Sequence, residues 1–430
     1  MPEAGRAERR LGILLLAGLA AFVAHVLAAV PAGFAAAFLW AAALLGSTRV
    51  DRVTRGLALA LVVAGLGLGL LAAGRGAAPE PLRLATVNLP IVALFLGVAF
   101  LGLVRPDAEA PSPPPREGGL WTTLLSVHLI GAVINLAMAA IAGDRMARDG
   151  RLAVPEATAL ARSYCAAAFW SPFFVAAAVA HTYAPGADPR LTLPLGLAGA
   201  VAALALTARD VRRRSGASLP GFAPDVASIR LTVLLLAIVL VVKGLRPELP
   251  MVVVVTVVTP PVALALLPRA SRRGAPERLL ERTLPATAAQ VLLFLAAGVF
   301  AEGAAALIGS LVGSAEAGSW RPGPWCFPLV TAGIVAAGYV GLHPVITIAA
   351  WSSLLLPLGV DPSLLAFAFL AGWAVGTAVA PLSGMNLFLV GRYGLAPQAL
   401  ARAGGPYVLR MLLVVTLLLA LGEAARRLLP

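Results

Sequence analysis

The sequence predicts an all-α polytopic membrane protein with about 11 transmembrane helices and two re-entrant hairpins, arranged as two inverted repeats. Of its 430 residues, 60% are hydrophobic and only 12% are charged, which is more apolar than a soluble domain. Apolar runs of about 17–25 residues, long enough to cross a bilayer, recur along the chain. Clusters of helix-breaking and hydrogen-bonding residues interrupt some of these runs. We expect one transmembrane domain over residues 1–430.

The positive charge of the chain lies between the apolar runs. The net charge is +13, and the arginines occupy short connecting segments, as they do on the cytoplasmic face of membrane proteins. Segments 209–214 and 269–282 are the most basic, and we expect both to be cytoplasmic loops. No helix carries a basic stripe interleaved with aromatic residues, which argues against a nucleic-acid partner. These features predict a multi-pass protein of the bacterial inner membrane.

Taken in chain order, the apolar segments are about 11–30, 31–46, 56–74, 86–104, 120–142, 152–181, 191–208, 228–246, 249–267, 286–312, 328–356, 363–390 and 405–421. The first resembles the apolar core of a signal sequence, but it continues into the second without a convincing cleavage site, so we expect a retained helix. Residues 105–119 are polar and rich in proline, and we expect a linker there.

A weak internal repeat is visible, with repeat one at about 56–208 and repeat two at about 249–421. In each copy a histidine in an apolar segment precedes a Pro/Ser break, which is followed by a tyrosine. In the first copy these are His128, Ser171-Pro172 and Tyr183. In the second they are His343-Pro344, Pro381-Leu382-Ser383-Gly384 and Tyr393. Such an order, found twice, is typical of a duplicated transporter bundle.

The distribution of basic loops bears on the relative orientation of the two copies. If every apolar segment crosses the bilayer, the copies are parallel, and the basic loop at 49–55 does not fall on the same side as the others. If 120–142 and 328–356 instead enter and leave on one side as re-entrant hairpins, nearly all basic loops fall inside and the copies are inverted. We favour the inverted arrangement, and the parallel one remains open.

A hairpin, a Pro/Ser-broken helix and a closing helix, present twice, resemble the ion transporter superfamily, which includes divalent-anion/sodium symporters and arsenite exporters. The resemblance covers roughly 86–208 and 286–421. The Ser-Asn-Thr hairpin tips of the anion/sodium symporters are missing; His128 with Asn135 and His343-Pro344 with Thr347 stand in the matching places. The resemblance implies small, often anionic substrates that move together with sodium ions or protons.

The histidines of the expected hairpins are the first candidate binding residues. Pro344 would end or kink its helix and free backbone carbonyls, while the imidazole of His343 offers a donor, an acceptor or a proton site. The alternative is a kinked helix whose histidine bonds a neighbouring backbone group. His128 and Asn135 are seven residues apart and so share a helical face, where the amide could bind solute or join helices. Thr347 completes this set.

The two expected breaks supply the remaining binding candidates. Ser171-Pro172 marks the first, and Ser383, Gly384 and Asn386 follow the proline of the second. Proline removes a donor, glycine allows close approach, and serine and asparagine can ligate a cation or bond a carboxylate. A half-helix that begins near Ser383 would direct its positive end at an anion. The alternative at each position is an ordinary packed proline kink.

Glu302 is the candidate for ion coupling, together with His343. It lies within an apolar segment, where a carboxylate is costly unless it is paired or protonated. Arg410, in the last segment, could pair with Glu302, meet an anion, or extend toward the membrane surface. Protons and sodium ions both remain open as the coupling ion, and we expect no other cofactor and no bound metal.

These features predict a secondary transporter whose partners are a small-molecule solute and the lipid bilayer. We find no catalytic motif, no Walker loop and no metal-ligand spacing, so we expect neither an enzyme nor an ATP-driven pump. Two alternatives remain: a membrane enzyme that acts on a lipid-linked substrate, and a non-transporting scaffold with dry, packed breaks. The sequence leaves the solute, the direction of transport and the choice between monomer and homodimer open.

Overall fold

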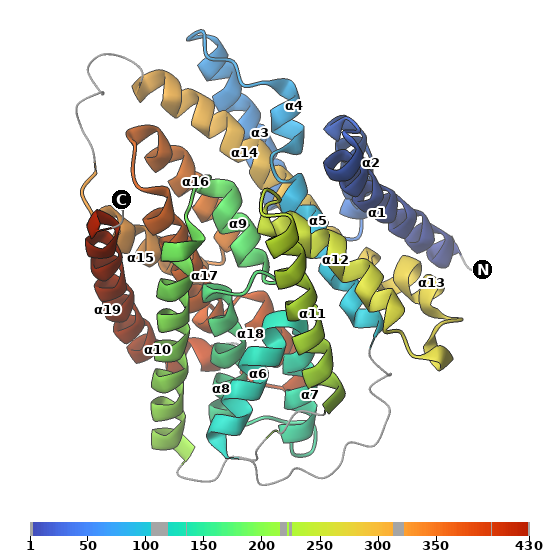
Figure 1. The fold of residues 1–430 in the computed structure, drawn as a ribbon, viewed down its shortest axis with the longest axis vertical. Coiled ribbons are helices and arrows are strands. Elements are labelled where there is room, and N and C mark those ends of the chain that lie inside the picture. The colour runs from blue at the N-terminus through green and yellow to red at the C-terminus, as the bar shows by residue number, and fades with distance from the viewer. Residues whose placement is uncertain are drawn as a thin grey trace. The chain divides into compact units, whose positions relative to one another are not determined.

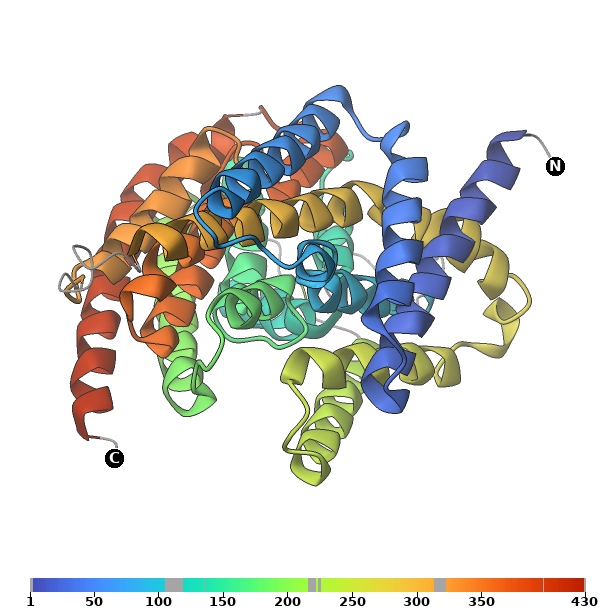
Figure 2. The same ribbon diagram turned by 90° about the horizontal axis from the view of Figure 1, so that it is seen from above.

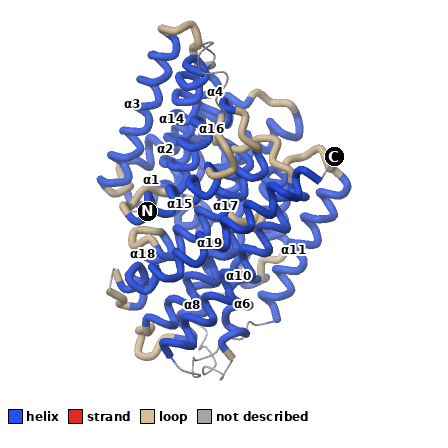
Figure 3. Tube along the Cα trace, turned by 90° about the vertical axis from the view of Figure 1, so that its left-hand side faces the viewer, coloured by secondary structure: helices blue, strands red, loops and turns tan. Residues whose placement is uncertain are grey.

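The computed structural model describes residues 3–104, 119–134, 136–215, 222, 226–312, 322–396 and 398–428. These residues form helices and loops, with one isolated bridge between Arg148 and Arg151 as their only extended pairing (Figures 1 and 3). The helices are α1 (Glu3–Ala28), α2 (Ala32–Ser47), α3 (Arg52–Ala73), α4 (Pro81–Thr86), α5 (Leu89–Ala99), η1 (Phe100–Leu103), α6 (Leu120–Ile134), α7 (Leu136–Met146), α8 (Val154–Cys165), η2 (Ala166–Phe169), α9 (Val175–Tyr183), α10 (Pro189–Ser215), α11 (Val226–Leu245), α12 (Met251–Ala265), η3 (Arg269–Ser271), α13 (Ala275–Arg278), η4 (Leu279–Thr283), η5 (Pro285–Thr287), α14 (Ala288–Val312), α15 (Cys326–Tyr339), α16 (Pro344–Leu355), η6 (Leu356–Leu358), α17 (Pro362–Val379), α18 (Gly384–Tyr393) and α19 (Ala399–Leu428).

Within the described residues, seven helical stretches are long and apolar enough to cross a membrane. They are Gly5–Ala28, Arg52–Ala73, Pro81–Leu103, Pro189–Arg214, Ala275–Leu311, Pro362–Tyr393 and Ala399–Arg427. Shorter apolar helices are Ala32–Ser47, Leu120–Val133, Met251–Ala265, Cys326–Tyr339 and Pro344–Leu358. Each apolar segment predicted from the sequence contains at least one helix, in agreement with an all-α, multi-pass membrane protein. The number of crossings and the re-entrant course of the hairpins stay predictions.

Side-chain caps fix where several of these helices begin. Asp51 precedes α3 and accepts a hydrogen bond from the Thr54 backbone N–H at 2.9 Å. Asp361 precedes α17 and accepts from the N–H groups of Ser363 and Leu364, with Pro362 in the first helical turn. Both arrangements satisfy backbone donors that a helix N-terminus leaves without partners. The expected linker at 105–119 lies almost wholly outside the described residues.

The chain divides into two compact units, each assembled from separate stretches of sequence. Unit 1 comprises Met1–Glu109, Ala237–Arg321 and Ala349–Gly359. Its main packing pairs are α1 with α2, α3 with α14, and α5 with α12. Figure 2 shows α3 and α14 side by side. Their backbones are in close contact at Gly65 and Gly303: a Cβ placed on Gly303 would lie only 1.9 Å from the carbonyl oxygen of Gly65. Glycine at both positions allows this approach.

Unit 2 comprises Ala110–Leu236, Pro322–Ile348 and Val360–Pro430. α17 is buried along almost its full length and contacts α15, α19, α10, α8 and α9. Around it, α6 packs on α7 and α8, and α10 packs on α8 and α19. The boundary between the units passes through α16, so the segment expected to form the second hairpin is shared between them.

Candidate functional site

The first helix interruption separates α8 and its 3-10 extension from α9, which begins only at Val175. Pro172 explains the break, because it has no N–H to donate and disfavours helical geometry in the residue before it. Ser171 is buried; its hydroxyl donates to the Ala132 carbonyl at 2.5 Å and accepts from the Phe173 N–H at 3.2 Å. The break expected at Ser171-Pro172 is therefore present, and its serine is bonded to α6.

The second interruption separates α17 from α18, which begins at Gly384. In a continuous helix the carbonyl of Thr377 would accept from residue 381, but Pro381 has no N–H. The Ser383 hydroxyl takes its place and donates to that carbonyl at 2.8 Å. The same oxygen accepts from the Asn386 N–H at 3.3 Å and so caps α18. One serine thus closes the end of α17 and the start of α18.

Asn386 carries an unused acceptor beside this second break. Its side chain is 1% exposed, and Nδ2 donates to the Ala380 carbonyl at 2.8 Å. That bond fixes the orientation of the amide, and the buried Oδ1 has no hydrogen-bond partner among the described residues. A buried acceptor without a partner is costly, so the position suits a cation or a solute N–H or O–H group. A Cβ on the neighbouring Gly384 would meet nothing within 4 Å.

His128 has both ring nitrogens engaged. Its Nε2 lies 3.1 Å from the indole N–H of Trp170, which can only donate, so this nitrogen is the acceptor. Its Nδ1 lies 3.1 Å from the Ser163 carbonyl and therefore carries the proton. The neutral histidine joins α6 to α8 and to the first break. Asn135, its expected partner, lies outside the described residues.

His343 lies in the turn between α15 and α16, half-buried, and its ring meets the Trp373 ring edge-on with centroids 5.3 Å apart. Its Nδ1 accepts from the Val345 backbone N–H at 3.3 Å. The Thr347 hydroxyl donates to the Pro344 carbonyl at 3.0 Å, which is a local bond of the first helical turn. In both halves of the chain, a histidine of the expected hairpin thus contacts a tryptophan of the following broken helix.

The second turn and the second break also touch. Gly341 has φ +91°, a conformation that glycine adopts without strain. A Cβ at Gly341 would lie 2.8 Å from a methyl carbon of Leu382, and a Cβ at Gly338 would lie 3.4 Å from Ala380. The first half shows the corresponding contact in the bond from Ser171 to Ala132. Each expected hairpin therefore meets the interruption of its own half.

Glu302 lies on α14 in unit 1, whereas His343 belongs to unit 2. The carboxylate of Glu302 accepts a hydrogen bond from Nη2 of Arg83 on α4, at 3.1 Å. The side chain of Glu302 is 15% exposed and that of Arg83 is 64% exposed. Glu302 is thus ion-paired in this structure, and its role in ion coupling stays a prediction.

An ion-pair cluster in unit 2 was not predicted from the sequence. Arg162 on α8 is 2% exposed; it donates to Asp210 on α10 at 2.9 Å and to the carbonyl of Ala403 on α19, also at 2.9 Å. Its guanidinium lies 4.1 Å from the ring centroid of Tyr407. Arg410 donates to the other oxygen of Asp210 at 2.7 Å. The cluster joins three helices through one buried carboxylate.

This cluster corrects two expectations. Residues 209–214 do not form a loop, because α10 continues to Ser215 and places Asp210 within a helix. Arg410 does not pair with Glu302, because Asp210 is its partner. The available signal was Arg162 itself: an arginine within an apolar segment needs a counter-charge, and such residues are rare unless they have a role.

No protein-family model matches this sequence, and a search of curated proteins gives no match. A search of solved structures matches the crystal structure of the YdaH transporter of Alcanivorax borkumensis, which was described as having an unusual topology. The TM-score is 0.54 at 17% sequence identity, and the match covers 86% of this chain and 98% of that one. The protein therefore has the fold of a membrane transporter.

Proposed function

We propose that this protein is a secondary active transporter that moves a small solute across the bacterial inner membrane, coupled to protons or sodium ions. The observation that carries the proposal is the contact, in both halves of the chain, between a histidine-bearing segment and a helix interruption. Within a bilayer, irregular backbone is tolerated only where protein or a wet cavity surrounds it. Paired interruptions of this kind form the binding sites of many secondary transporters.

The second interruption supplies the better ligand chemistry. We assign solute or ion binding there to Ser383, Gly384 and Asn386, with His343 and Thr347 from the adjoining turn. Asn386 Oδ1 is the buried acceptor, and the N–H groups of Gly384 and Met385, which precede the capped Asn386 N–H, are donors at the positive end of α18. This combination fits a small solute with both an anionic group and a donor, or a sodium ion bound with an anion.

In the first half we assign the corresponding positions to His128, Asn135, Ser171 and Pro172. The bonds of His128 to Trp170 and Ser163 hold this half in place. Proton coupling through His343 or Glu302 and sodium coupling through Asn386 both remain part of the proposal. The site would work in a monomer or in a homodimer.

We also propose two inverted repeats and membership of the ion transporter superfamily. Equivalent helices of the two proposed repeats pack in the same way, which supports the duplication. α6 packs on α8 as α15 packs on α17, and α8 packs on α10 as α17 packs on α19. In unit 1 the matched pairs are α3 with α14 and α12 with α5, and each joins a helix of one repeat to a helix of the other. Each unit contains segments from both proposed repeats.

Reconstitution into proteoliposomes tests the proposal. A panel of small radiolabelled carboxylates would be offered with an inward proton gradient, an inward sodium gradient or neither. We expect one gradient to drive accumulation of at least one solute, and Asn386→Ala to abolish it. Gly391→Ala is the matched control, because it lies on the same helix and a Cβ there would meet nothing within 4 Å. Uptake that ignores both gradients for every solute, or that survives Asn386→Ala, would contradict this assignment.

A further inference from the structure

The cluster around Asp210 holds more positive charge than the nearby carboxylate can balance. Arg162 and Arg410 both donate to Asp210, and Arg214 donates to Ala403 at 3.0 Å, the same carbonyl that Arg162 contacts. Three guanidinium groups and one carboxylate leave two uncompensated positive charges among the described residues. Two cations held close together in one network attract an additional anion.

The exposed side of the cluster has the donors for that anion. Arg162 is enclosed by Asp210, Ala403 and the Tyr407 ring. Arg410, in contrast, is 32% exposed, and to the described part of the chain it donates through Nη1 alone. Arg214 is exposed and donates there through Nη2 alone. A guanidinium has five N–H donors in a fork that matches phosphate.

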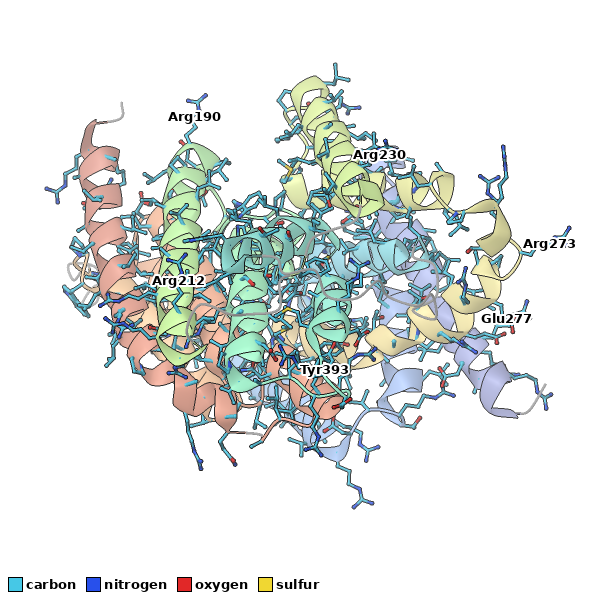
Figure 4. The ribbon with its side chains drawn as sticks, turned by 90° about the horizontal axis from the view of Figure 1, so that it is seen from below. Arg190, Arg212, Arg230, Arg273, Glu277 and Tyr393 are labelled. Carbon is cyan, nitrogen blue, oxygen red and sulfur yellow. The ribbon has the colours of Figure 1, made fainter. Side chains whose placement is uncertain are left out.

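The position along the helices indicates where these donors lie in the membrane. Asp210 on α10 contacts Arg410 on α19. Arg214 lies one turn further along α10, but its contact, Ala403, lies earlier on α19. The two helices therefore run antiparallel. The C-terminal end of α10 therefore adjoins the N-terminal end of α19. This end of α10 carries consecutive arginines, the pattern of a cytoplasmic membrane boundary. Arg190 lies in the first turn of α10 and Arg212 in its last turn, and both side chains are labelled in Figure 4.

An apolar stripe continues from the cluster along the outer face of α19. Four leucines at a spacing of four residues share one side of this helix, and each has 64–67% of its surface exposed. They are Leu409, Leu413, Leu417 and Leu421. The stripe begins beside Arg410 and leads away from the basic end, so the surface offers cationic donors followed by an apolar track.

We propose that Arg214 and Arg410 bind the phosphate of an anionic phospholipid in the cytoplasmic leaflet, with an acyl chain along the α19 leucine stripe. The charge excess selects an anionic headgroup over a zwitterionic one, and the stripe selects a lipid over free phosphate. Basic pockets between transmembrane helices use the same combination of contacts. The site is independent of transported solute, and it fastens α10 to α19 beside the buried Arg162.

Native mass spectrometry and thermal unfolding of the delipidated full chain test the site. Phosphatidylglycerol, phosphatidylcholine and inorganic phosphate would be added separately. We expect phosphatidylglycerol to remain bound and to raise the unfolding temperature, while the other two have little effect. Arg214→Gln should weaken phosphatidylglycerol binding roughly tenfold or more, as expected for loss of a charge-assisted bond. Arg410→Gln should do the same while Arg162 still pairs with Asp210.

Arg212→Gln is the matched control, because it removes one positive charge from the same exposed end of α10 but from a different face. It should leave phosphatidylglycerol binding within twofold of the wild type. Equal stabilisation by phosphatidylcholine, equal stabilisation by inorganic phosphate, or equal weakening by all three substitutions would overturn the proposal. Because Arg214 is exposed, its variant remains informative even if Arg410→Gln fails to fold.

Discussion

Replacing Ser383 with alanine is the most direct perturbation of the second interruption. The hydroxyl has two roles: it donates to the Thr377 carbonyl at 2.8 Å and accepts from the Asn386 N–H at 3.3 Å. No backbone group can replace the first bond, because the residue that would supply it in a helix is Pro381. The substitution therefore affects the end of α17 and the start of α18 together.

The size of the effect follows from these two bonds. Loss of a serine N-cap costs about 1 kcal/mol, and a partly buried carbonyl left without a donor costs about 1–3 kcal/mol. We therefore expect Ser383→Ala to lower the free energy of unfolding by about 2–4 kcal/mol. Ser383→Thr keeps the hydroxyl and should recover most of the loss.

Unfolding by sodium dodecyl sulfate in mixed micelles would measure this difference. Gly391→Ala, on the same half-helix with open space around its Cβ, should leave stability unchanged or raise it by up to about 1 kcal/mol through helix propensity. If Ser383→Ala and Gly391→Ala unfold alike, the serine does not hold the interruption together. If the threonine variant is as unstable as the alanine variant, the hydroxyl is not the reason.

Three further predictions concern other contacts. Gly303→Ala should lower the unfolding free energy by about 1–3 kcal/mol relative to Gly309→Ala on the same helix, because the first Cβ would meet a carbonyl of α3 at 1.9 Å and the second would meet nothing; equal stabilities would contradict this. Asp144→Asn should cost about 1 kcal/mol by removing the two-bond ion pair with Arg392, and a double-mutant cycle on unfolding should show that coupling. The Thr54 backbone N–H lowers the pKa of Asp51 below its ordinary 3.8. The Asp51 carboxylate therefore stabilises α3 above about pH 4, and this stabilisation is lost as the pH falls further. Asp51→Asn should remove this part of the pH dependence of unfolding, and an unchanged acid unfolding profile would contradict the prediction.

The sequence predicted the helix interruptions because their cause is local. Pro172 and Pro381 each remove a backbone donor, and a serine lies within two residues of each proline, which together indicate a break. Proline alone is not sufficient, because α10, α12 and α19 continue through Pro194, Pro260-Pro261 and Pro406. The apolar runs predicted the helices for the same reason, since length and hydropathy are properties of contiguous residues. The segment predicted at 363–390, for example, spans α17 and α18 with the break between them.

Long-range polar partners were not predictable in the same way. Arg162 and Asp210 are 48 residues apart and meet only because α8 packs on α10. A run of arginines from 209 onward is typical of a loop, yet α10 accommodates it because charged side chains at a helix end reach the membrane surface. Trp170 illustrates the same limit: its donation to His128 closes a contact between two helices that sequence spacing does not reveal.

The two interruptions differ in how many of their polar side-chain atoms have hydrogen-bond partners, and this difference bears on which interruption would bind solute under the proposed function. In the first, both nitrogens of His128 and the hydroxyl of Ser171 have protein partners. In the second, the bonds of Ser383 hold the backbone, while the buried Asn386 Oδ1 has no hydrogen-bond partner within the described part of the chain. An acceptor kept unsatisfied at a cost is expected where a ligand completes it. Under the proposed function, we therefore expect Asn386 in the second half to contribute more to solute binding than His128 and Ser171 in the first half.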